Sequence, residues 1–176
     1  MGILICGLNG SGKSTVGRTL AQRIGCRFID VEDLYFRDAA LDHIYDDPRS
    51  KEEATELLNE MIAEDKRFVF AAVKGDYGDM LLRSLDCAVV IDVPKDIRLK
   101  RVYNRSYEKF GERILPGGDL YEKENQFFSA VESRPNDFVE GWLQRTVVCP
   151  VIHIDGTLPV EENVEKLVRQ LKRYTF

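Results

Sequence analysis

Short apolar runs recur along the chain, and each is bounded by polar residues, glycine or proline. They cover residues 3–6, 27–30, 68–73, 87–93 and 151–155. Runs of this length that are apolar at most positions are typical of strands buried on both faces of a sheet. The pattern therefore predicts five parallel strands.

Between these runs, apolar residues recur at the spacing of an α-helix. One helix is predicted after residue 12, with apolar residues at positions 16, 20 and 24 and Gly25 placed to end it. A second is predicted after Ser50, with apolar positions 57, 58, 61 and 62. A third is predicted after Pro159, with apolar positions 160, 164, 167, 168 and 171.

A glycine-rich segment joins the first predicted strand to the first predicted helix. It reads Gly7-Leu8-Asn9-Gly10-Ser11-Gly12-Lys13-Ser14, followed by Thr15, and matches the P-loop pattern G-x-x-x-x-G-K-[ST] at every fixed position. Glycines let successive backbone N–H groups turn toward phosphate oxygens, and the following helix points its positive end at the same place. Lys13 adds a cation for the β- and γ-phosphates, and the Ser14 hydroxyl can ligate Mg²⁺. The segment predicts a site for ATP or a similar nucleoside triphosphate.

The order of elements predicts an α/β fold, a three-layer α/β/α P-loop NTPase with a five-stranded parallel sheet. We expect residues 1–176 to form one domain. Two polar segments interrupt the alternation: residues 39–51, within an excursion at about 37–66, and residues 106–124, which contain Pro116-Gly117-Gly118. Both are expected over the carboxyl edge of the sheet, where open α/β sheets bind ligands. We interpret the first as acceptor-binding and the second as a lid.

Composition and charge narrow the possible partners. The chain is 44% hydrophobic and 31% charged, with a formal net charge of −5 and no long run of lysine or arginine. Nucleic-acid and membrane-surface binders usually carry a basic face, so neither partner is expected, and no obligate protein partner is evident. The N-terminal residues lack the layout of a signal peptide, and the four cysteines are scattered, as expected of buried, reduced thiols. A cytoplasmic location is predicted.

Other segments indicate the class of P-loop protein. The base-reading and switch motifs of small GTPases are absent, and the run at 87–93 does not end in the Asp-Glu pair of motor ATPases. Residues 26–36 read C-R-F-I-D-V-E-D-L-Y-F and resemble the D-x-D segment of shikimate kinases and the D-x-D-D-L segment of gluconate kinases. Residues 154–161, I-D-G-T-L-P-V-E, resemble the adenine-side loop of nucleoside monophosphate kinases. Over nearly its whole length, the chain resembles the P-loop kinases of small molecules and nucleoside monophosphates.

The resemblance implies roles outside the P-loop. Arg101 and Arg105 are similar to the arginines at the lid base of adenylate kinases, where Arg101 would also contact the nucleotide. Arg134, in the stretch R-P-N-D, resembles the R-x-D-D stretch on the return side of the lid. ATP is implied as phosphate donor, with Mg²⁺. The residues implied to border the adenine are Asp155, Gly156 and Pro159.

Three carboxylates follow the second predicted strand. Asp30 and Glu32 would project to the same side of an extended strand end, beside the P-loop. One carboxylate can hold Mg²⁺ or its waters while another orients and deprotonates an acceptor hydroxyl. We assign Asp30, with Ser14, to the metal, and Glu32 or Asp33 to the acceptor. The alternatives are a solvated position for Asp30 and, for Asp33, the N-cap of a helix at 34–40.

Three arginines lie at i, i+3 and i+7 on a helix predicted after residue 94: Arg98, Arg101 and Arg105. A permanently charged, forked guanidinium suits the charge that spreads over the γ-phosphate during transfer. We single out Arg101 and Arg105, then Arg134, with Arg113 as a weaker candidate. The alternative is a solvated charged face. Closure of the lid would bring these groups in and exclude water.

The acceptor side matches no single kinase family. The triple-glycine loop of shikimate kinases and the D-G-F-P-R segment of adenylate kinases are absent. Arg37, Arg49 and Lys74 could each hold a carboxylate or phosphate, and their order stays open. The chain is predicted to be a kinase that moves the γ-phosphate of ATP to a small-metabolite hydroxyl or a nucleoside monophosphate, with Lys13 as a catalytic residue. The alternatives are an ATP-binding sensor and a slow NTPase.

Overall fold

The computed structural model describes residues 1–36 and 48–172, and its centre is a parallel sheet. The strands are β1 (Gly2–Cys6), β2 (Arg27–Asp30), β3 (Phe68–Ala71), β4 (Cys87–Asp92) and β5 (Val151–Asp155). They lie in the order β2-β3-β1-β4-β5, and every neighbouring pair is parallel. All five predicted strands are confirmed. The third and fourth end earlier than predicted, and the fourth stops just before Pro94, which has no N–H to donate.

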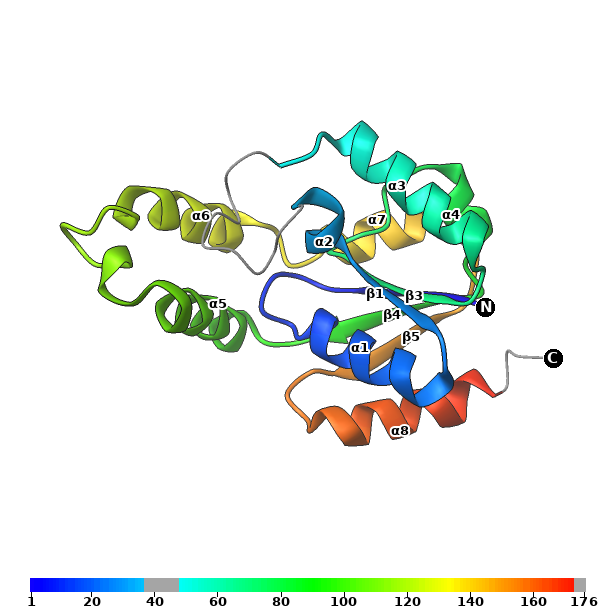
Figure 1. The fold of residues 1–176 in the computed structure, drawn as a ribbon. Helices are drawn as coiled ribbons and strands as arrows, with labels where there is room; N and C mark the ends of the chain where they lie inside the picture. The colour runs from blue at the N-terminus through cyan, green and yellow to red at the C-terminus, as the bar shows by residue number, and fades with distance from the viewer. Residues whose placement is uncertain (37–47, 173–176) are drawn as a thin grey trace.

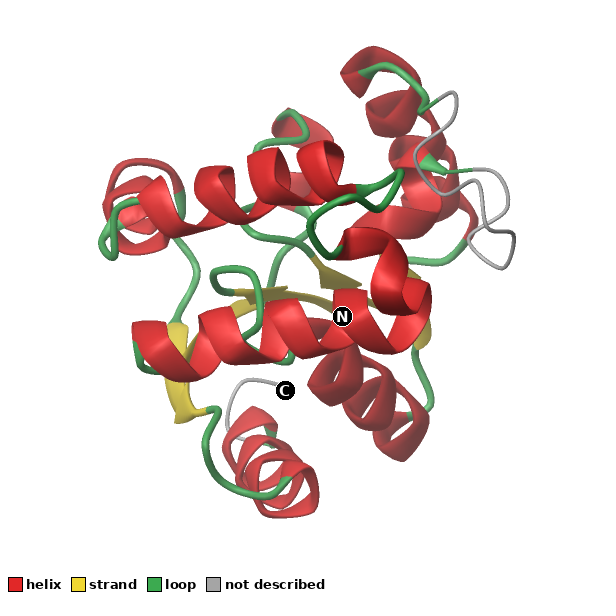
Figure 2. Cartoon of the chain, turned by 90° about the vertical axis from the view of Figure 1, so that its left-hand side faces the viewer, coloured by secondary structure: helices red, strands yellow, loops and turns green. Residues whose placement is uncertain are grey.

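Helices cover both faces of the sheet (Figures 1 and 2). One face carries α1 (Lys13–Ile24) and α8 (Val160–Leu171). The other carries α2 (Val31–Tyr35), α3 (Lys51–Glu64), α4 (Asp79–Arg83) and α7 (Phe138–Thr146). This arrangement is the predicted three-layer α/β/α fold of P-loop NTPases.

The alternation of side chains explains why the central strand β1 is apolar throughout. In β1, Ile3 and Ile5 pack in the cluster formed with α1 and α8, whereas Leu4 and Cys6 pack in the cluster on the opposite face. All four side chains are fully buried. A strand with only one covered face would instead alternate apolar and polar residues.

The helix ends follow local sequence signals. Gly25 ends α1 with a φ of 66°, and its N–H donates to the carbonyl oxygen of Ala21. Ser50 caps α3: its hydroxyl accepts from the N–H of Glu53 at 3.1 Å, and the Glu53 carboxylate accepts from the N–H of Ser50 at 2.8 Å. Pro159 precedes the first residue of α8, as predicted.

A helical hairpin projects beyond the carboxyl ends of the strands (Figure 1). It consists of α5 (Lys95–Phe110), the 3-10 helix η1 (Gly111–Ile114) and α6 (Tyr121–Ser133). The rings of Tyr103 and Phe128 meet between α5 and α6, with centroids 5.5 Å apart. Its buried residues Phe110, Ile114 and Val131 belong to neither of the two clusters that flank the sheet. The hairpin therefore has its own small apolar core.

The two polar segments have different outcomes. Residues 106–124, the predicted lid, comprise the end of α5, η1, a turn and the start of α6. Residues 37–47 of the predicted acceptor-binding excursion lie outside the described residues, and most of its remainder is α3. Among the described helices, α2, α4 and α7 were not predicted.

In the parts of the chain that the structure describes, no helix combines the length and apolar character needed to cross a bilayer.

The capping of α3 gives a first prediction. Replacing Ser50 with alanine removes both reciprocal bonds, because each requires the serine hydroxyl or the geometry that it holds. We expect the free energy of unfolding, measured by urea titration, to fall by about 1 kcal/mol. Ser50→Asp, which can accept the same N–H, should recover most of this loss. Equal losses in the two variants would contradict the capping role.

Candidate functional site

The P-loop connects β1 to α1 at the carboxyl edge of the sheet (Figure 1). Gly7, Gly10 and Gly12 have φ values of 153°, 82° and 94°, a conformation that favours glycine. A Cβ on Gly10 would also collide with the carbonyl oxygen of Arg98. The loop therefore needs glycine to follow this path.

The N-terminus of α1 is not capped by a side chain. Gly12 occupies the N-cap, and within this helix, which is described throughout, the first turn holds no acidic residue. Uncapped N–H groups and the positive end of the helix dipole favour an anion. Ser11 is buried, and the described residues offer its hydroxyl no hydrogen-bond partner. This set of donors fits the phosphates of a nucleotide.

Lys13, the first residue of α1, supplies the cation of the loop. Its ammonium donates to the carbonyl oxygen of Leu8 at 3.3 Å. Desolvation lowers the pKa of Lys13 to about 8, although the carboxylates of Asp30 and Glu32 oppose this shift. A desolvated ammonium of this kind is stabilised by an anionic ligand.

A cavity of about 390 Å³, which we call the P-loop cavity, opens between the loop, the end of β2 and α5. The predicted site residues that line it are Asn9, Gly10, Gly12, Lys13, Ser14, Thr15, Asp30, Glu32, Arg101 and Arg105. The predicted site residues outside its lining are Gly7, Ser11, Asp33, Arg134, Asp155, Gly156 and Pro159. Residues from three separate segments of the chain thus meet around one space.

Ser14 and Asp30, the residues predicted for Mg²⁺, both line the P-loop cavity. Asp30 is buried at the end of β2, and one of its oxygens accepts from the N–H of Glu32 at 3.1 Å. Among the described residues, no cluster of three or more His, Cys, Asp or Glu side chains could cage a metal. Mg²⁺ often takes one or two protein oxygens and completes its shell with phosphate oxygens and water, so this pair of oxygen donors fits it.

The carboxylates after β2 occupy different places. Glu32 is exposed in the P-loop cavity, and its oxygen lies 4.0 Å from a guanidinium nitrogen of Arg105. Asp33 lines none of the cavities described here, and burial, with the nearby Asp30 charge, raises the pKa of Asp33. The alternative that Asp33 caps a helix is wrong, because α2 begins at Val31 and its N-cap is Asp30. The side chain of Asp30 accepts the N–H of Glu32 in the first turn of α2.

A second cavity, of about 290 Å³, adjoins the P-loop cavity, and we call it the side cavity. The two cavities share Val31, Glu32 and Val73. The other residues that line the side cavity are Tyr35, Phe36, Lys74, Asp76, Tyr77, Arg134 and Phe138. Glu32 therefore stands at the boundary between a phosphate-binding loop and a pocket with aromatic walls and two cations.

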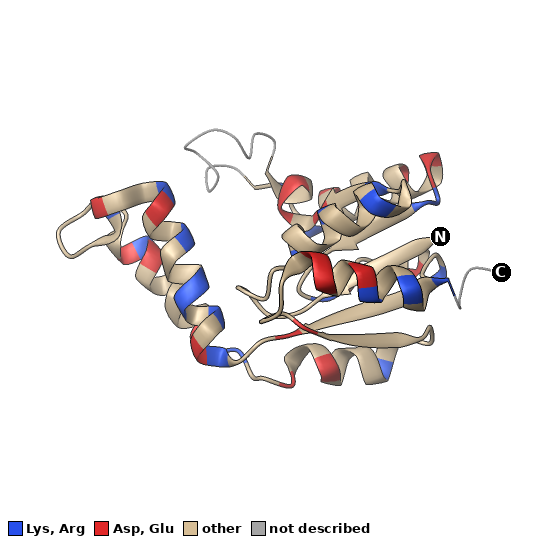
Figure 3. Ribbon diagram, turned by 90° about the horizontal axis from the view of Figure 1, so that it is seen from below, with Lys and Arg blue, Asp and Glu red and all other residues tan. Residues whose placement is uncertain are grey.

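Basic and acidic residues alternate along the projecting hairpin (Figure 3). The α5 arginines are equivalent by spacing, but they have different partners. Arg101 donates to the carbonyl oxygens of Gly156 at 3.1 Å and Gly10 at 3.4 Å, so it links the β5–α8 loop to the P-loop. Arg105 lies one turn further along α5, beside Glu32. Both side chains reach the P-loop cavity from the base of the hairpin.

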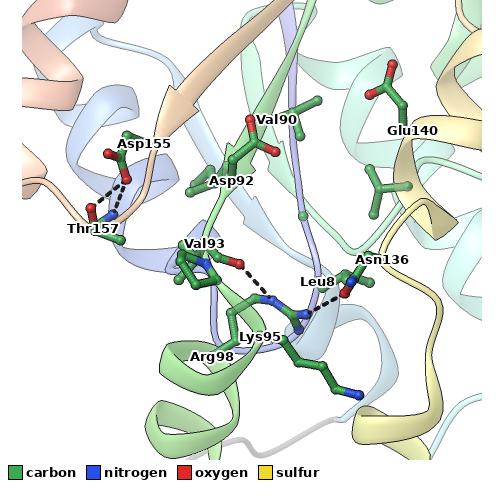
Figure 4. Close-up of a pocket in the computed structure, with 14 residues that line it drawn as sticks. Leu8, Val90, Asp92, Val93, Lys95, Arg98, Asn136, Glu140, Asp155 and Thr157 are labelled. Atoms are coloured by element: carbon green, nitrogen blue, oxygen red, sulfur yellow. Dashed lines mark hydrogen bonds between the residues drawn. The ribbon is translucent and has the colours of Figure 1, made fainter.

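Arg98 is buried behind the P-loop, in the lining of a third cavity of about 470 Å³ (Figure 4). Its guanidinium donates to the carbonyl oxygens of Val93 at 3.1 Å and Asn9 at 3.4 Å, and to the side-chain oxygen of Asn136 at 3.5 Å. Burial lowers the pKa of Arg98. Arg98 thus braces the outer side of the loop, and the solvated face considered from the sequence does not apply to it.

Two other predicted arginines have defined partners. Arg134, in the connection between α6 and α7, donates to the side-chain oxygen of Asn9 at 2.7 Å. Arg113 forms two bonds to the Asp119 carboxylate, at 3.0 and 2.8 Å, within the turn of the hairpin. Arg113 lines none of the three cavities.

The β5–α8 loop is held close to the P-loop. Gly156 donates its N–H to the carbonyl oxygen of Asp92 at 2.8 Å, and a Cβ on Gly156 would lie 3.0 Å from the carbonyl oxygen of Ser11. The Asp155 carboxylate accepts from the N–H and hydroxyl of Thr157, at 2.8 and 2.6 Å (Figure 4). The Asp155 side chain thus fixes the conformation of the β5–α8 loop, and the lack of a side chain at Gly156 allows this loop to lie close to the P-loop.

Sequence reasoning did not find the partners of Arg134 and Lys74. Both cations lie over the ring of Phe138, with the Arg134 guanidinium carbon 5.3 Å and the Lys74 nitrogen 4.8 Å from the ring centroid. Lys74 carried a signal, because it follows β3 at the edge of the sheet where ligands bind. Phe138 carried none, since an aromatic residue at the start of a helix is expected to be core.

Comparison with known proteins agrees with the fold described above. A family described as an AAA domain matches residues 3–126. The uncharacterized protein YqaC of Bacillus subtilis (strain 168) is 27% identical over 177 residues, which cover 96% of each chain.

Several solved kinases share the fold. A gluconokinase from Sinorhizobium meliloti is 18% identical with a TM-score of 0.54, over 99% of this chain and 97% of that one. A shikimate kinase from Acinetobacter baumannii, in complex with shikimate, is 15% identical with a TM-score of 0.58, over 99% and 94%. A deoxyadenosine kinase from M. mycoides is 14% identical with a TM-score of 0.55, over 98% and 100%. The resemblance to P-loop kinases is confirmed at the level of the fold.

The lowered pKa of Lys13 predicts a pH dependence of nucleotide affinity. Phosphates beside the ammonium would raise its pKa, so above about pH 8 the complex holds a proton that the free protein lacks. The affinity for a non-hydrolysable ATP analogue, measured by titration calorimetry, should then fall by up to about tenfold per pH unit above about pH 8.

The matched control for this titration is Lys13→Arg, since a guanidinium keeps its charge throughout that range. Its affinity should stay level where the affinity of the unmodified protein falls. A level profile for the unmodified protein would contradict the assignment of Lys13 to the phosphates.

Proposed function

The chain belongs to the AAA-domain family of P-loop proteins, and from that membership we propose that it is an ATP-dependent phosphotransferase. It would move the γ-phosphate of ATP to the hydroxyl of a small metabolite or to a nucleoside monophosphate. One observation carries the proposal: the P-loop cavity and the side cavity adjoin, and Glu32 lies in the wall that they share. A sensor or a simple NTPase has no need of a second pocket at this place.

The donor side would be held by the loop and α1. The N–H groups at the start of α1 and the ammonium of Lys13 would bind the β- and γ-phosphates, where both are placed to neutralise negative charge. Ser14 and Asp30 would hold Mg²⁺, which supplies charge neutralisation across the β- and γ-oxygens when bound. Arg101, with the β5–α8 loop that it contacts, would border the nucleotide.

The acceptor side would be served by Glu32. A carboxylate at the boundary of the two cavities can orient an acceptor hydroxyl and take its proton. The hydroxyl oxygen would bond to the γ-phosphorus as the bond from that phosphorus to the β-phosphate oxygen breaks, which releases ADP. Asp33 has no such position. Arg105, which pairs loosely with Glu32, would stabilise the charge on the transferred group, and Arg134 would approach it from the side cavity.

The hairpin of α5 and α6 is proposed to act as the lid. Arg101 and Arg105 belong to α5 and both line the P-loop cavity, so inward movement of the hairpin would carry these cations toward the phosphates. Because its apolar core is separate from those of the sheet, it can move as a unit. Closure would exclude water and reduce hydrolysis.

Lys13→Ala tests the donor side. We expect it to abolish detectable phosphotransfer to any member of an acceptor panel of sugar acids, nucleosides and nucleotides, because the β- and γ-phosphates lose their cation. Affinity for the ATP analogue should fall with it. Turnover equal to that of the unmodified protein would refute the site. Phosphate release without transfer, in the unmodified protein, would indicate an NTPase instead.

Glu32→Gln tests the acceptor side and has a matched control in Asp33→Asn. Loss of a general base costs about 10²- to 10⁴-fold in rate, so kcat for an alcohol acceptor should fall by this range in Glu32→Gln. Affinity for the ATP analogue should change little. Asp33→Asn removes a similar charge one residue away and should keep most of the rate. A larger loss in Asp33→Asn would reverse the assignment.

A further inference from the structure

The side cavity holds charged groups besides Glu32, and two of them, Lys74 and Asp76, have no part in the transfer step. Lys74 lies at its wall, half-buried, after the end of β3. Arg134 enters from the connection between α6 and α7, and Asp76 lies close to Lys74. Lys74 and Asp76 lie in the connection between β3 and α4, so two separate segments of the chain meet in the cavity that Glu32 borders.

One aromatic ring positions both cations. The Lys74 nitrogen lies 4.8 Å and the Arg134 guanidinium carbon 5.3 Å from the centroid of the Phe138 ring. Cations at this distance from a ring are attracted to its negative face, which restricts their movement. Arg134 is further fixed by its 2.7 Å bond to the side-chain oxygen of Asn9 on the P-loop. The two charges are thus held in place before any ligand arrives.

The nearby carboxylates offset only part of the positive charge of Lys74 and Arg134. Asp76 is shared by two ammonium groups, Lys51 at 2.9 Å and Lys74 at 3.3 Å. Arg134 has no carboxylate within ion-pair distance among residues 1–36 and 48–172, and Glu32 already lies beside Arg105. Two ammonium groups therefore share one carboxylate, and Arg134 adds a positive charge that no described carboxylate pairs with, which leaves a surplus of positive charge beside the cavity.

The other candidates for an acceptor-binding cation are engaged elsewhere or undescribed. The guanidinium of Arg49 donates to the carbonyl oxygens of Leu34 at 2.9 Å and Asp33 at 3.4 Å, and Arg49 is outside the lining of the side cavity. Arg37 lies outside the described residues. Besides the carboxylates of Glu32 and Asp76, the remaining wall consists of aromatic and aliphatic side chains.

We propose that the phosphate acceptor carries an anionic group, a carboxylate or a phosphate, and that Lys74 is the residue that selects for it. Arg134 shares the anion, and Phe138 positions both cations. The inference rests on the proposed function, because it concerns the acceptor of that same site. Preorganised cations gain charge-assisted bonds from an anion and nothing comparable from a neutral analogue, and here Lys74 only shares a carboxylate while Arg134 has none among the described residues.

The test uses pairs of acceptors that differ only in charge: nucleosides with their 5′-monophosphates, and cyclic or linear polyols with the corresponding carboxylic acids. With ATP and Mg²⁺, the full chain should phosphorylate or bind the anionic member of a pair and not the neutral one. The pair that responds distinguishes a phosphate ester from a carboxylate. Binding is followed by thermal shift with the ATP analogue present.

Lys74→Met should raise KM for the anionic acceptor by roughly 10- to 100-fold, the range for loss of a charge-assisted bond. The KM for ATP should stay within about twofold, since Lys74 does not line the P-loop cavity. Lys74→Arg keeps the charge and should recover part of the loss, which separates charge from folding. Lys51→Met removes a cation that also binds Asp76 but lies outside the cavity lining, and it should change KM by less than about threefold.

The outcomes separate this inference from the proposed function. Equal use of neutral and anionic acceptors, or an unchanged KM in Lys74→Met, would overturn the selection by charge while leaving a phosphotransferase in place. If no member of any pair is phosphorylated or bound, both proposals are wrong. An effect of Lys51→Met as large as that of Lys74→Met would also overturn the role given to Lys74.

Discussion

The positive charge gathered at the N-terminus of α1 is the constraint around which the rest of the site is arranged. The helix begins at a glycine that cannot cap it, its first turn contains no carboxylate, and a lysine at that turn is desolvated enough to lower its pKa to about 8. Such an arrangement is costly without an anion, because both the free amides and the ammonium have lost water. Asp30 and Glu32 offset part of the charge, and a polyphosphate would offset the remainder.

The sheet order explains why distant residues can serve this one place. With β1 between β3 and β4, the chain leaves the centre to one side and later crosses to the other, and the crevice at such a switch point lies outside the carboxyl ends of the strands. Each of these strands therefore places a different group at the same edge of the sheet. Asp30 is the last residue of β2, Lys74 follows β3, and Arg101 lies on α5, the helix after β4. The tight approach of Gly156 to the P-loop closes the arrangement on the β5 side.

Much of the fold and the P-loop could be predicted from the sequence, because the sequence patterns that indicate them are local. The inner strands β1, β3 and β4 are almost wholly apolar because both of their faces are covered, and the P-loop is defined by neighbours in the sequence. The features that the sequence did not reveal depend on tertiary contacts. The arginines on α5 are equivalent by spacing, yet Arg98 is buried behind the loop whereas Arg101 and Arg105 reach the cavity. Phe138 could be matched with Lys74 only after β3 and α7 were placed in space.

The central claim is that the backbone N–H groups from Gly12 to Thr15 bind a triphosphate, and amide chemical shifts measured by NMR test it most directly. During titration with Mg²⁺ and a non-hydrolysable ATP analogue, the amide signals of these residues should move together and reach saturation at one equivalent, because each N–H gains a phosphate oxygen as acceptor. If these signals stay in place while others respond, or if nothing responds, the nucleotide does not bind in the loop and the account is wrong.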